Sequence, residues 1–332
     1  MAEGHLLRKL IRAGSRIDSE EFRTAAEELI QLERDKKHHL LANDLERILY
    51  GERSSAARPP ARPVAQDSPK DRERGLALIE FREPVRDLTD IVLSDENRSV
   101  LQEALMEQGR SELLRSYGLR PISRLLFCGP PGCGKTLAAE VLATELGLQL
   151  ATVRFDAVVS SFLGETAANL RKVFDFLAAQ RVVALFDEFD AIGKEREDPA
   201  EHGELKRVVN SFLQMIDAYR GSSLLIAATN HERVLDRAIW RRFDEVLFFD
   251  KPNLEQIRQL LPVKLRGVRY DLPIEDPVFL NHFTGFTQAS IERVLIRAIK
   301  AMALKGRKLL TIDLVTEARE REDRRTALLS KL

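Results

Sequence analysis

Between residues 125 and 249 the chain alternates between short, continuously apolar stretches and longer segments with apolar residues at helical spacing. The apolar stretches are the strand candidates: Leu125–Cys128, Leu150–Phe155, Val182–Phe186, Leu224–Ala228 and Val246–Phe249. The segments between them place apolar residues at every third or fourth position, as amphipathic helices do. Continuously apolar strands are typical of parallel sheets that are buried on both faces. The pattern therefore predicts an α/β fold in which helices flank a parallel sheet, over residues 76–251.

The pattern changes after Pro252, where no strand is evident. Helical periodicity covers the segments Glu255–Leu261, Ser290–Leu304 and Thr311–Leu328. Because the apolar residues of these segments form stripes and not continuous runs, each helix needs a partner to cover one face. We therefore expect residues 252–332 to form a small helical domain.

The first 75 residues have yet another pattern. Asp18-Ser19-Glu20-Glu21 resembles a capping box, and apolar residues follow it at helical spacing. A second apolar stripe ends near Gly51. We expect residues 1–51 to form a helical module that binds a partner. Residues 52–75 gather Pro, Ala, Ser and Arg without periodicity, which predicts a flexible linker.

Charge and composition exclude several classes of protein. The 332 residues include 52 Lys and Arg and 52 Asp and Glu, so no net charge favours nucleic acid or an anionic membrane. No apolar run reaches about eighteen residues, and the N-terminal segment lacks the apolar core of a signal peptide. Cys128 and Cys133 are too few for a disulfide framework or a zinc site. We expect a cytoplasmic protein.

The turn after the first predicted strand of this domain has the pattern of a phosphate-binding loop. Nucleotide contacts are expected from Gly129, Pro130, Pro131, Gly132, Cys133, Gly134, Lys135, Thr136 and Leu137. The glycines let backbone N–H groups converge on phosphate oxygens at a helix N-terminus. Lys135 is placed to reach the β- and γ-phosphates, and the Thr136 hydroxyl to bind Mg²⁺. A glycine-rich turn with an accidental lysine is the alternative, but the strand before and the helix after favour the phosphate loop.

A second motif, VVALFDEFD, delivers two carboxylates at the end of a predicted strand. Asp187 is expected to hold Mg²⁺ through water, and Glu188 to polarise the attacking water as a general base. Placing two carboxylates side by side is costly without a cation, so a purely structural role is a weak alternative. The two motifs together predict an enzyme that hydrolyses ATP with Mg²⁺ as its cofactor.

With the segment LLIAATNHERVLDRAIWRRFD, these motifs resemble the AAA+ ATPases, and within them the AAA subgroup of protein-remodelling motors. The resemblance covers about Asp87 to Leu304. It implies that Asn230 is the sensor 1 residue, on a strand inserted between the two loop-bearing strands, where its amide orients the lytic water. Taken alone, Asn230 fits equally well as a residue that caps a strand end.

The resemblance also implies an arginine that reaches the ATP of the neighbouring subunit. The segment AIWRRFDE is shorter than the family pattern and lacks its Pro-Gly. Arg242 matches best and Arg241 is the alternate, while Glu245 stands where some relatives carry a second arginine. A surface ion pair is the alternative role for this arginine.

The segment FDAVVSSFLGETAANLRKVFDFL resembles the stretch that carries the substrate-gripping pore loop of the family. Phe162, Leu163 and Gly164 fill the aromatic–hydrophobic–glycine triplet. The alternative is that Phe162 lies in the core, against which the preceding serines argue. Residues 194–207 are a candidate for a second pore loop, although an ordinary solvated loop fits them better.

The segment FTGFTQASIERVLIRAIKAM resembles the family's lid helix, which packs against the adenosine. Gly285 and Ala289 match the pattern, whereas Gln288 and Ser290 replace the usual Gly and Asp. No arginine occupies the sensor 2 position. Upstream, DLTDIVL corresponds to the segment that packs on adenine, so the resemblance places two further residues in the base pocket, namely Asp90 and Ile91.

These features favour an ATP-driven, ring-forming motor, a homohexamer, that remodels or unfolds protein substrates. The chain contains neither an H-E-x-x-H nor a G-x-S-x-G motif, so degradation requires a separate protease subunit as partner. The layout resembles bacterial stand-alone AAA ATPases that are paired with subtilisin-like proteases in phage-defence modules. The alternatives are a loader acting on DNA-bound complexes, against which the neutral charge counts, and a nucleotide-gated scaffold.

Overall fold

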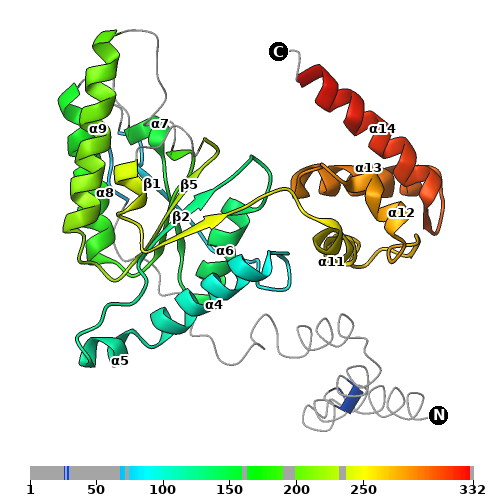
Figure 1. The fold of residues 1–332 in the computed structure, drawn as a ribbon, viewed down its shortest axis with the longest axis horizontal. Helices are drawn as coiled ribbons and strands as arrows, with labels where there is room; N and C mark the ends of the chain where they lie inside the picture. Colours follow the sequence, from blue (N-terminus) through cyan, green and yellow to red (C-terminus); the bar gives the residue numbers. More distant parts are fainter. Residues whose placement is uncertain are drawn as a thin grey trace, which may run out of the picture. The chain divides into compact units, whose positions relative to one another are not determined.

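The computed structural model describes residues 26, 28–29, 68–71, 75–158, 163–189, 199–231 and 237–329 (Figure 1). They belong almost entirely to one compact unit, Ala61–Leu332. The predicted N-terminal module and most of the predicted linker lie outside the described residues. Within the unit we call residues 76–251 the α/β domain and residues 252–329 the helical domain. None of the described helices is long and apolar enough to cross a membrane.

The α/β domain is built on a six-stranded sheet with the order β1-β3-β4-β5-β2-β6. The strands are β1 Ile79–Arg82, β2 Arg124–Cys128, β3 Leu150–Val153, β4 Val183–Phe186, β5 Leu224–Thr229 and β6 Glu245–Phe248. All neighbours pair in parallel except β1, which is antiparallel to β3. The predicted parallel sheet is confirmed, and β5 lies between β4 and β2 as the resemblance implies.

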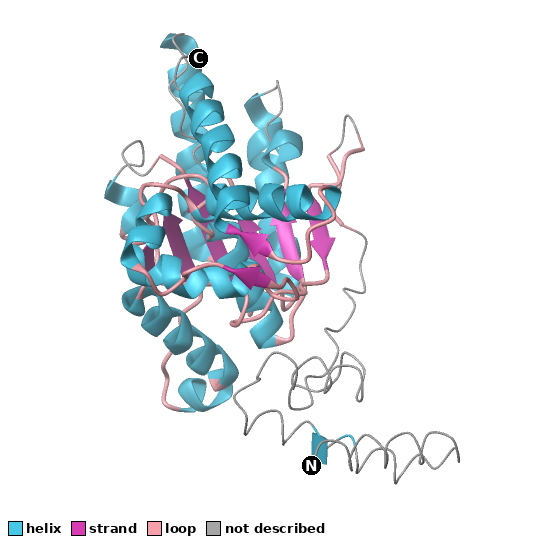
Figure 2. Ribbon diagram, turned by 90° about the vertical axis from the view of Figure 1, so that its right-hand side faces the viewer, coloured by secondary structure: helices cyan, strands magenta, loops and turns pink. Residues whose placement is uncertain are grey.

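Alternate residues of each strand enter two different cores, which explains the continuously apolar strands. In β5, Leu225 and Ala227 pack on one side of the sheet and Leu224 and Ile226 on the other. Helices α8 (Leu163–Ala179) and α9 (Pro199–Ala218) cover the first side. Helices α4 (Asp95–Gly109) and α6 (Lys135–Leu146) cover the second. Figure 2 shows the strands between helices on both sides.

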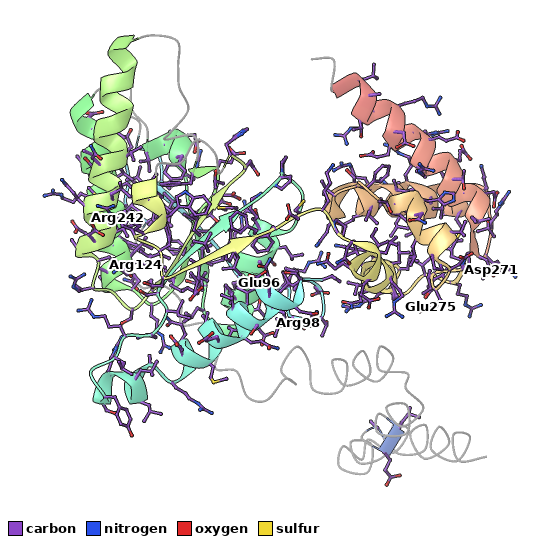
Figure 3. The ribbon with its side chains drawn as sticks, viewed as in Figure 1. Glu96, Arg98, Arg124, Arg242, Asp271 and Glu275 are labelled. Carbon is purple, nitrogen blue, oxygen red and sulfur yellow. The ribbon has the colours of Figure 1, made fainter. Side chains whose placement is uncertain are left out.

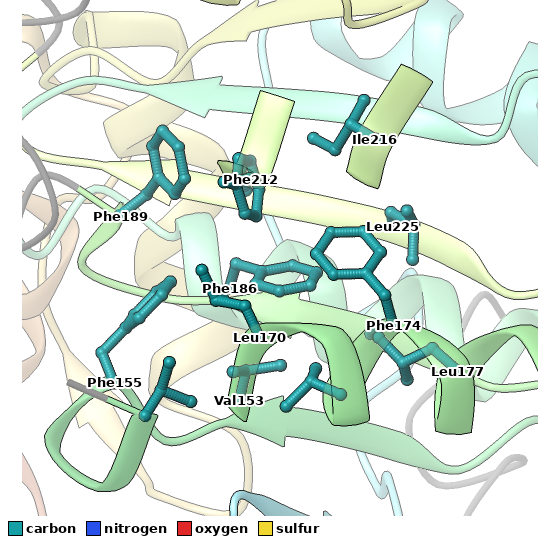
Figure 4. Close-up of a cluster of buried hydrophobic side chains, with 14 of the residues drawn as sticks. Val153, Phe155, Leu170, Phe174, Leu177, Phe186, Phe189, Phe212, Ile216 and Leu225 are labelled. Carbon is teal, nitrogen blue, oxygen red and sulfur yellow. The ribbon is translucent and has the colours of Figure 1, made fainter. Parts of the chain in front are cut away.

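Aromatic side chains dominate the core between the sheet and the helices α8 and α9 (Figure 4). Phe186, at the end of β4, stacks on Phe174 of α8 with ring centroids 5.6 Å apart. The ring centroids of Phe189 and Phe212 of α9 are 4.6 Å apart, and both rings are fully buried. Burying a phenylalanine stabilises the fold by about 1.5–3 kcal/mol, so the segment that follows β4 is anchored at both ends.

The helical domain packs four helices around its own core, as predicted. They are α11 Leu254–Lys264, α12 Pro277–Leu280, α13 Gln288–Leu304 and α14 Ile312–Leu329. A parallel pair of two-residue strands, β7 Tyr270–Asp271 and β8 Leu310–Thr311, joins the loops between them. We did not predict this pair, because two residues carry no detectable periodicity.

The edge of the large sheet also differs from the expectation. Residues 68–71, which the prediction assigned to the linker, hydrogen bond to residues 76–79: Leu78 N–H donates to Pro69 O at 2.8 Å. Asp71 is buried and accepts a hydrogen bond from Asn169 of α8. Phe155 belongs to a short helix and not to β3. The remaining short elements are α5 Ser111–Ser116, α7 Phe155–Val158, α10 Arg237–Trp240 and the 3₁₀ helix Asn281–Phe283.

Candidate active site

The predicted phosphate loop connects β2 to α6 and has the backbone that only glycine adopts easily. Gly129, Gly132 and Gly134 have φ angles of 134°, 78° and 101°. Gly134 precedes the first turn of α6, and no side chain caps that turn. The first N–H groups of a helix have no partner inside the helix and carry partial positive charge. The loop therefore presents N–H donors to an anion.

Lys135 lies inside this loop and is only 6% exposed. Its Nζ donates to Gly129 O at 2.6 Å and to Pro130 O at 2.9 Å. It also donates to Asn230 Oδ1 at 2.8 Å. Asn230 follows β5, which pairs with β2, so the sheet brings the predicted sensor to the predicted phosphate loop.

The two predicted magnesium ligands also meet. Thr136, in the first turn of α6, donates its hydroxyl to Asp187 Oδ2 at 2.8 Å. The other oxygen, Asp187 Oδ1, accepts the backbone N–H of Glu188 at 2.9 Å. Among the described residues other than glycine, Glu188 alone has a positive φ, 51°. A strained backbone of this kind persists only where its surroundings fix it. Here the fixed neighbours are Phe186 and Phe189.

This set of groups fits a nucleoside triphosphate with Mg²⁺. The loop supplies one ammonium group and a helix N-terminus, which match the phosphates. One hydroxyl and one carboxylate lie in contact, and Mg²⁺ is typically bound by one or two such groups together with phosphate oxygens and water. Cys133, inside the loop, is 1% exposed, and burial raises the pKa of its thiol. It therefore remains an uncharged, small side chain at neutral pH.

The helical domain reaches the same loop through the start of α13. The Ala289 N–H donates to Gly132 O at 3.0 Å. The Gln288 side chain donates through Nε2 to Val92 O at 2.9 Å and is 8% exposed. A methyl group at Gly134 would lie 3.4 Å from Gln288 Oε1. Ala289, which the resemblance places against the adenosine, thus hydrogen bonds to the predicted phosphate loop. Gln288 makes a contact that sequence reasoning treated only as a departure from the family pattern.

The predicted base pocket is joined to the helical domain by an ion pair. Arg266, just after α11, contacts Asp90 Oδ1 at 2.8 Å and also donates to Thr89 O. The Asp90 carboxylate accepts the Asp87 N–H as well. Ile91 is buried in the α/β domain. No sequence pattern pointed to Arg266, because an arginine after a helix is common and is usually exposed.

Three further predicted site residues are Gly285, Arg242 and Arg241. Gly285 has a φ of 85°, and a methyl group built there meets no atom within 4 Å. Arg242 Nε contacts Asp217 Oδ2 on α9 at 2.9 Å, and Arg241 is exposed. Figure 3 shows Arg242 beside Arg124, whose guanidinium donates to the Arg242 carbonyl. Arg242 therefore forms an ion pair within its own chain, as the alternative to the role in a neighbouring subunit expects.

The predicted pore loop is only partly within the described residues. Phe162 lies outside them. Helix α8 begins at Leu163 and continues through Gly164, but the surroundings of these two residues are not described. The proposed gripping role therefore stays a prediction. Of the second candidate pore loop, residues 199–207 belong to α9.

Comparison with known proteins gives a consistent assignment. Residues 125–251 match the family described as "ATPase family associated with various cellular activities (AAA)". The AAA family ATPase y4kL of Sinorhizobium fredii is 43% identical over 335 residues, which cover 100% of this chain and 99% of that protein. The chain belongs to the AAA family of ATPases. As an AAA ATPase it hydrolyses ATP.

Larger AAA proteins are also similar to this AAA ATPase. The ATP-dependent zinc metalloprotease FtsH 1 of Thermomicrobium roseum is 31% identical over 265 residues, 75% of this chain and 40% of that protein. The proteasome-activating nucleotidase of Sulfurisphaera tokodaii is 33% identical over 214 residues, 62% of this chain and 54% of that protein. The chain thus spans about half or less of these two relatives.

Proposed function

We propose that this AAA ATPase converts ATP hydrolysis into the remodelling or unfolding of protein substrates. One observation carries the enzymatic part: the Thr136 hydroxyl of the phosphate loop and the Asp187 carboxylate after β4 are in contact. The contact between Lys135 and Asn230, which follows β5, supports it. The mechanical part is supported by similarity to proteins named as an ATP-dependent protease and a proteasome-activating nucleotidase.

Each side chain of the site has a distinct proposed task in hydrolysis. Lys135 exchanges its loop carbonyl partners for the β- and γ-phosphate oxygens. Thr136 would hold Mg²⁺ directly and Asp187 through water, and the ion would supply positive charge for the phosphate oxygens. Glu188, which is exposed, accepts a proton from the attacking water. Asn230, fixed at the end of β5, orients that water.

A ring, which we propose to be a homohexamer, completes the site with an arginine from the next subunit. Arg242 is the better candidate, because it matches the family pattern best, and the exposed Arg241 is the alternate. In this role the Arg242 guanidinium exchanges Asp217 for the neighbour's ATP. An arginine supplied by a neighbour stabilises charge in the transition state of phosphoryl transfer. Adenine binds beside Asp90 and Ile91, against the start of α13.

We further propose that Phe162, Leu163 and Gly164 grip the substrate chain in the ring's pore. The N-terminal residues select the substrate or a separate protease subunit, and the protein works in the cytoplasm. A defence module with a subtilisin-like protease is one setting that would use such a motor.

The Phe162→Ala variant tests the proposed motor activity, and the unfolding of a tagged protein is the readout. We expect unchanged ATP hydrolysis and thermal midpoint but no unfolding of the tagged protein. Phe212→Ala is the matched control: Phe212 is fully buried, so its loss should cost about 3–5 kcal/mol and lower the midpoint. A Phe162→Ala midpoint as low as that of Phe212→Ala, or normal unfolding activity, contradicts the proposal.

A further inference from the structure

Gln288 connects three segments that are far apart in the sequence. It is the first residue of α13 and is 8% exposed, although its side chain is polar. Its Nε2 donates to the carbonyl of Val92 at 2.9 Å across 196 residues. Its Oε1 faces the phosphate loop, since a methyl group at Gly134 would lie 3.4 Å from that oxygen. One amide therefore hydrogen bonds to residues 91–93, which we call the hinge segment, and faces the phosphate loop.

The carbonyl that Gln288 binds belongs to a segment shared by the two domains. Ile91 and Leu93 pack in the core of the α/β domain. Val92, between them, packs in the core of the helical domain. A segment whose neighbouring residues enter different cores is sensitive to the packing of both domains. The Gln288 amide ties this segment to the start of α13.

We infer that Gln288 is a positioning residue that sets the base end of the nucleotide site. The inference rests on the proposed binding of adenine beside Asp90 and Ile91. Without the amide, the buried Val92 carbonyl loses its side-chain donor, and an unsatisfied buried carbonyl is costly. The hinge segment then rearranges to recover a partner, which moves the surface on which adenine stacks. The phosphate loop keeps its own contacts, including the hydrogen bond from Ala289 to Gly132.

This role differs from that of a structural glutamine elsewhere in the chain. Gln108 is also buried, at 5% exposed, and its Nε2 also donates to a backbone carbonyl, that of Ile122, at 2.6 Å. Gln108 lies at the end of α4, among residues that we assign no part in nucleotide binding. It is therefore a matched control for the loss of a buried amide.

The test compares ATP with inorganic tripolyphosphate, which has no base. Both are titrated against a fluorescent ATP analogue bound to the full chain. In Gln288→Met, which keeps the length of the side chain but has no donor, we expect the Kd for ATP to rise about tenfold, the scale of one buried hydrogen bond. The Kd for tripolyphosphate should change less than about twofold, and kcat at saturating ATP should fall by less than about threefold. Gln288→Ala should behave in the same way.

Gln108→Met should lower the thermal midpoint as Gln288→Met does, but leave the Kd for ATP unchanged. The inference is overturned if Gln288→Met binds ATP with the wild-type Kd, or if its Kd for tripolyphosphate rises as much as its Kd for ATP. It is also overturned if Gln108→Met and Gln288→Met raise the Kd for ATP equally. A wild-type chain that fails to bind ATP would overturn the proposed site itself and the inference with it.

Discussion

Gly129 is the position at which a single methyl group should do the most damage to the phosphate loop. Its φ of 134° is accessible to glycine but strained for alanine. A Cβ there would lie 2.2 Å from the carbonyl oxygen of Phe249 and 2.9 Å from its carbonyl carbon. Both are backbone atoms. They cannot swing aside, because the Phe249 N–H is bonded to Cys128 O at 2.8 Å, next to the loop.

The cost of Gly129→Ala has two parts. The backbone strain is about 1–2 kcal/mol, and forcing an extra carbon into a packed site costs typically 1–3 kcal/mol. We therefore expect the free energy of unfolding to fall by about 2–5 kcal/mol, which corresponds to roughly 5–15 °C in the thermal midpoint of a domain of this size. Because Gly129 belongs to the phosphate loop, a shift of its backbone should weaken ATP binding as well.

Gly118→Ala separates the overlap from the strain. Gly118 also has a positive φ, 73°, but a methyl group there meets no atom within 4 Å. This variant should lose only about 1 kcal/mol, the cost of placing alanine in a conformation that glycine prefers. Thermal unfolding of both variants, with and without ATP, is the measurement. Equal midpoints for the two variants would refute the reasoning, since the contact with Phe249 would then have no energetic consequence.

Three further predictions concern the site. Glu188→Gln should still bind ATP but release phosphate at least about a hundredfold more slowly, the scale of a lost general base; near-normal turnover contradicts its role. Arg242→Ala should bind ATP and hydrolyse it poorly, and mixing it with Lys135→Ala should restore part of the activity; mixed rings without restoration would place the arginine in its own subunit's site. A double-mutant cycle on thermal unfolding with Asp90→Asn and Arg266→Gln should give a coupling of about 1 kcal/mol, since the pair is half-buried; additive effects would show that the pair does not join the domains.

The sequence determined the elements whose cause is local. Each central strand is continuously apolar because its alternate residues enter different cores. The order of residues along the chain is enough to show this pattern. The phosphate loop is likewise local: its glycines, Lys135 and the start of α6 are consecutive residues. β1 was not predicted, because four residues in the order IEFR do not form an apolar run. The β7–β8 pair was not predicted for a different reason: two residues are too few to show a periodicity.

The contacts that make these motifs one site depend on the tertiary structure. The Lys135–Asn230 and Thr136–Asp187 contacts join residues 95 and 51 positions apart. The shared magnesium role predicted from the two motifs brought Thr136 and Asp187 together, whereas only the family resemblance placed Asn230 at the site. Whether Arg242 pairs within its own chain depends on where α9 places Asp217. In the sequence, Gln288 is only a departure from the glycine usual in the family at the start of this helix. Its importance was not predicted, because a glutamine gains a specific partner only after folding. Sequence periodicity reports which face of an element is buried, whereas a polar contact depends on the distance between two elements, and that distance is set by the packing of both cores.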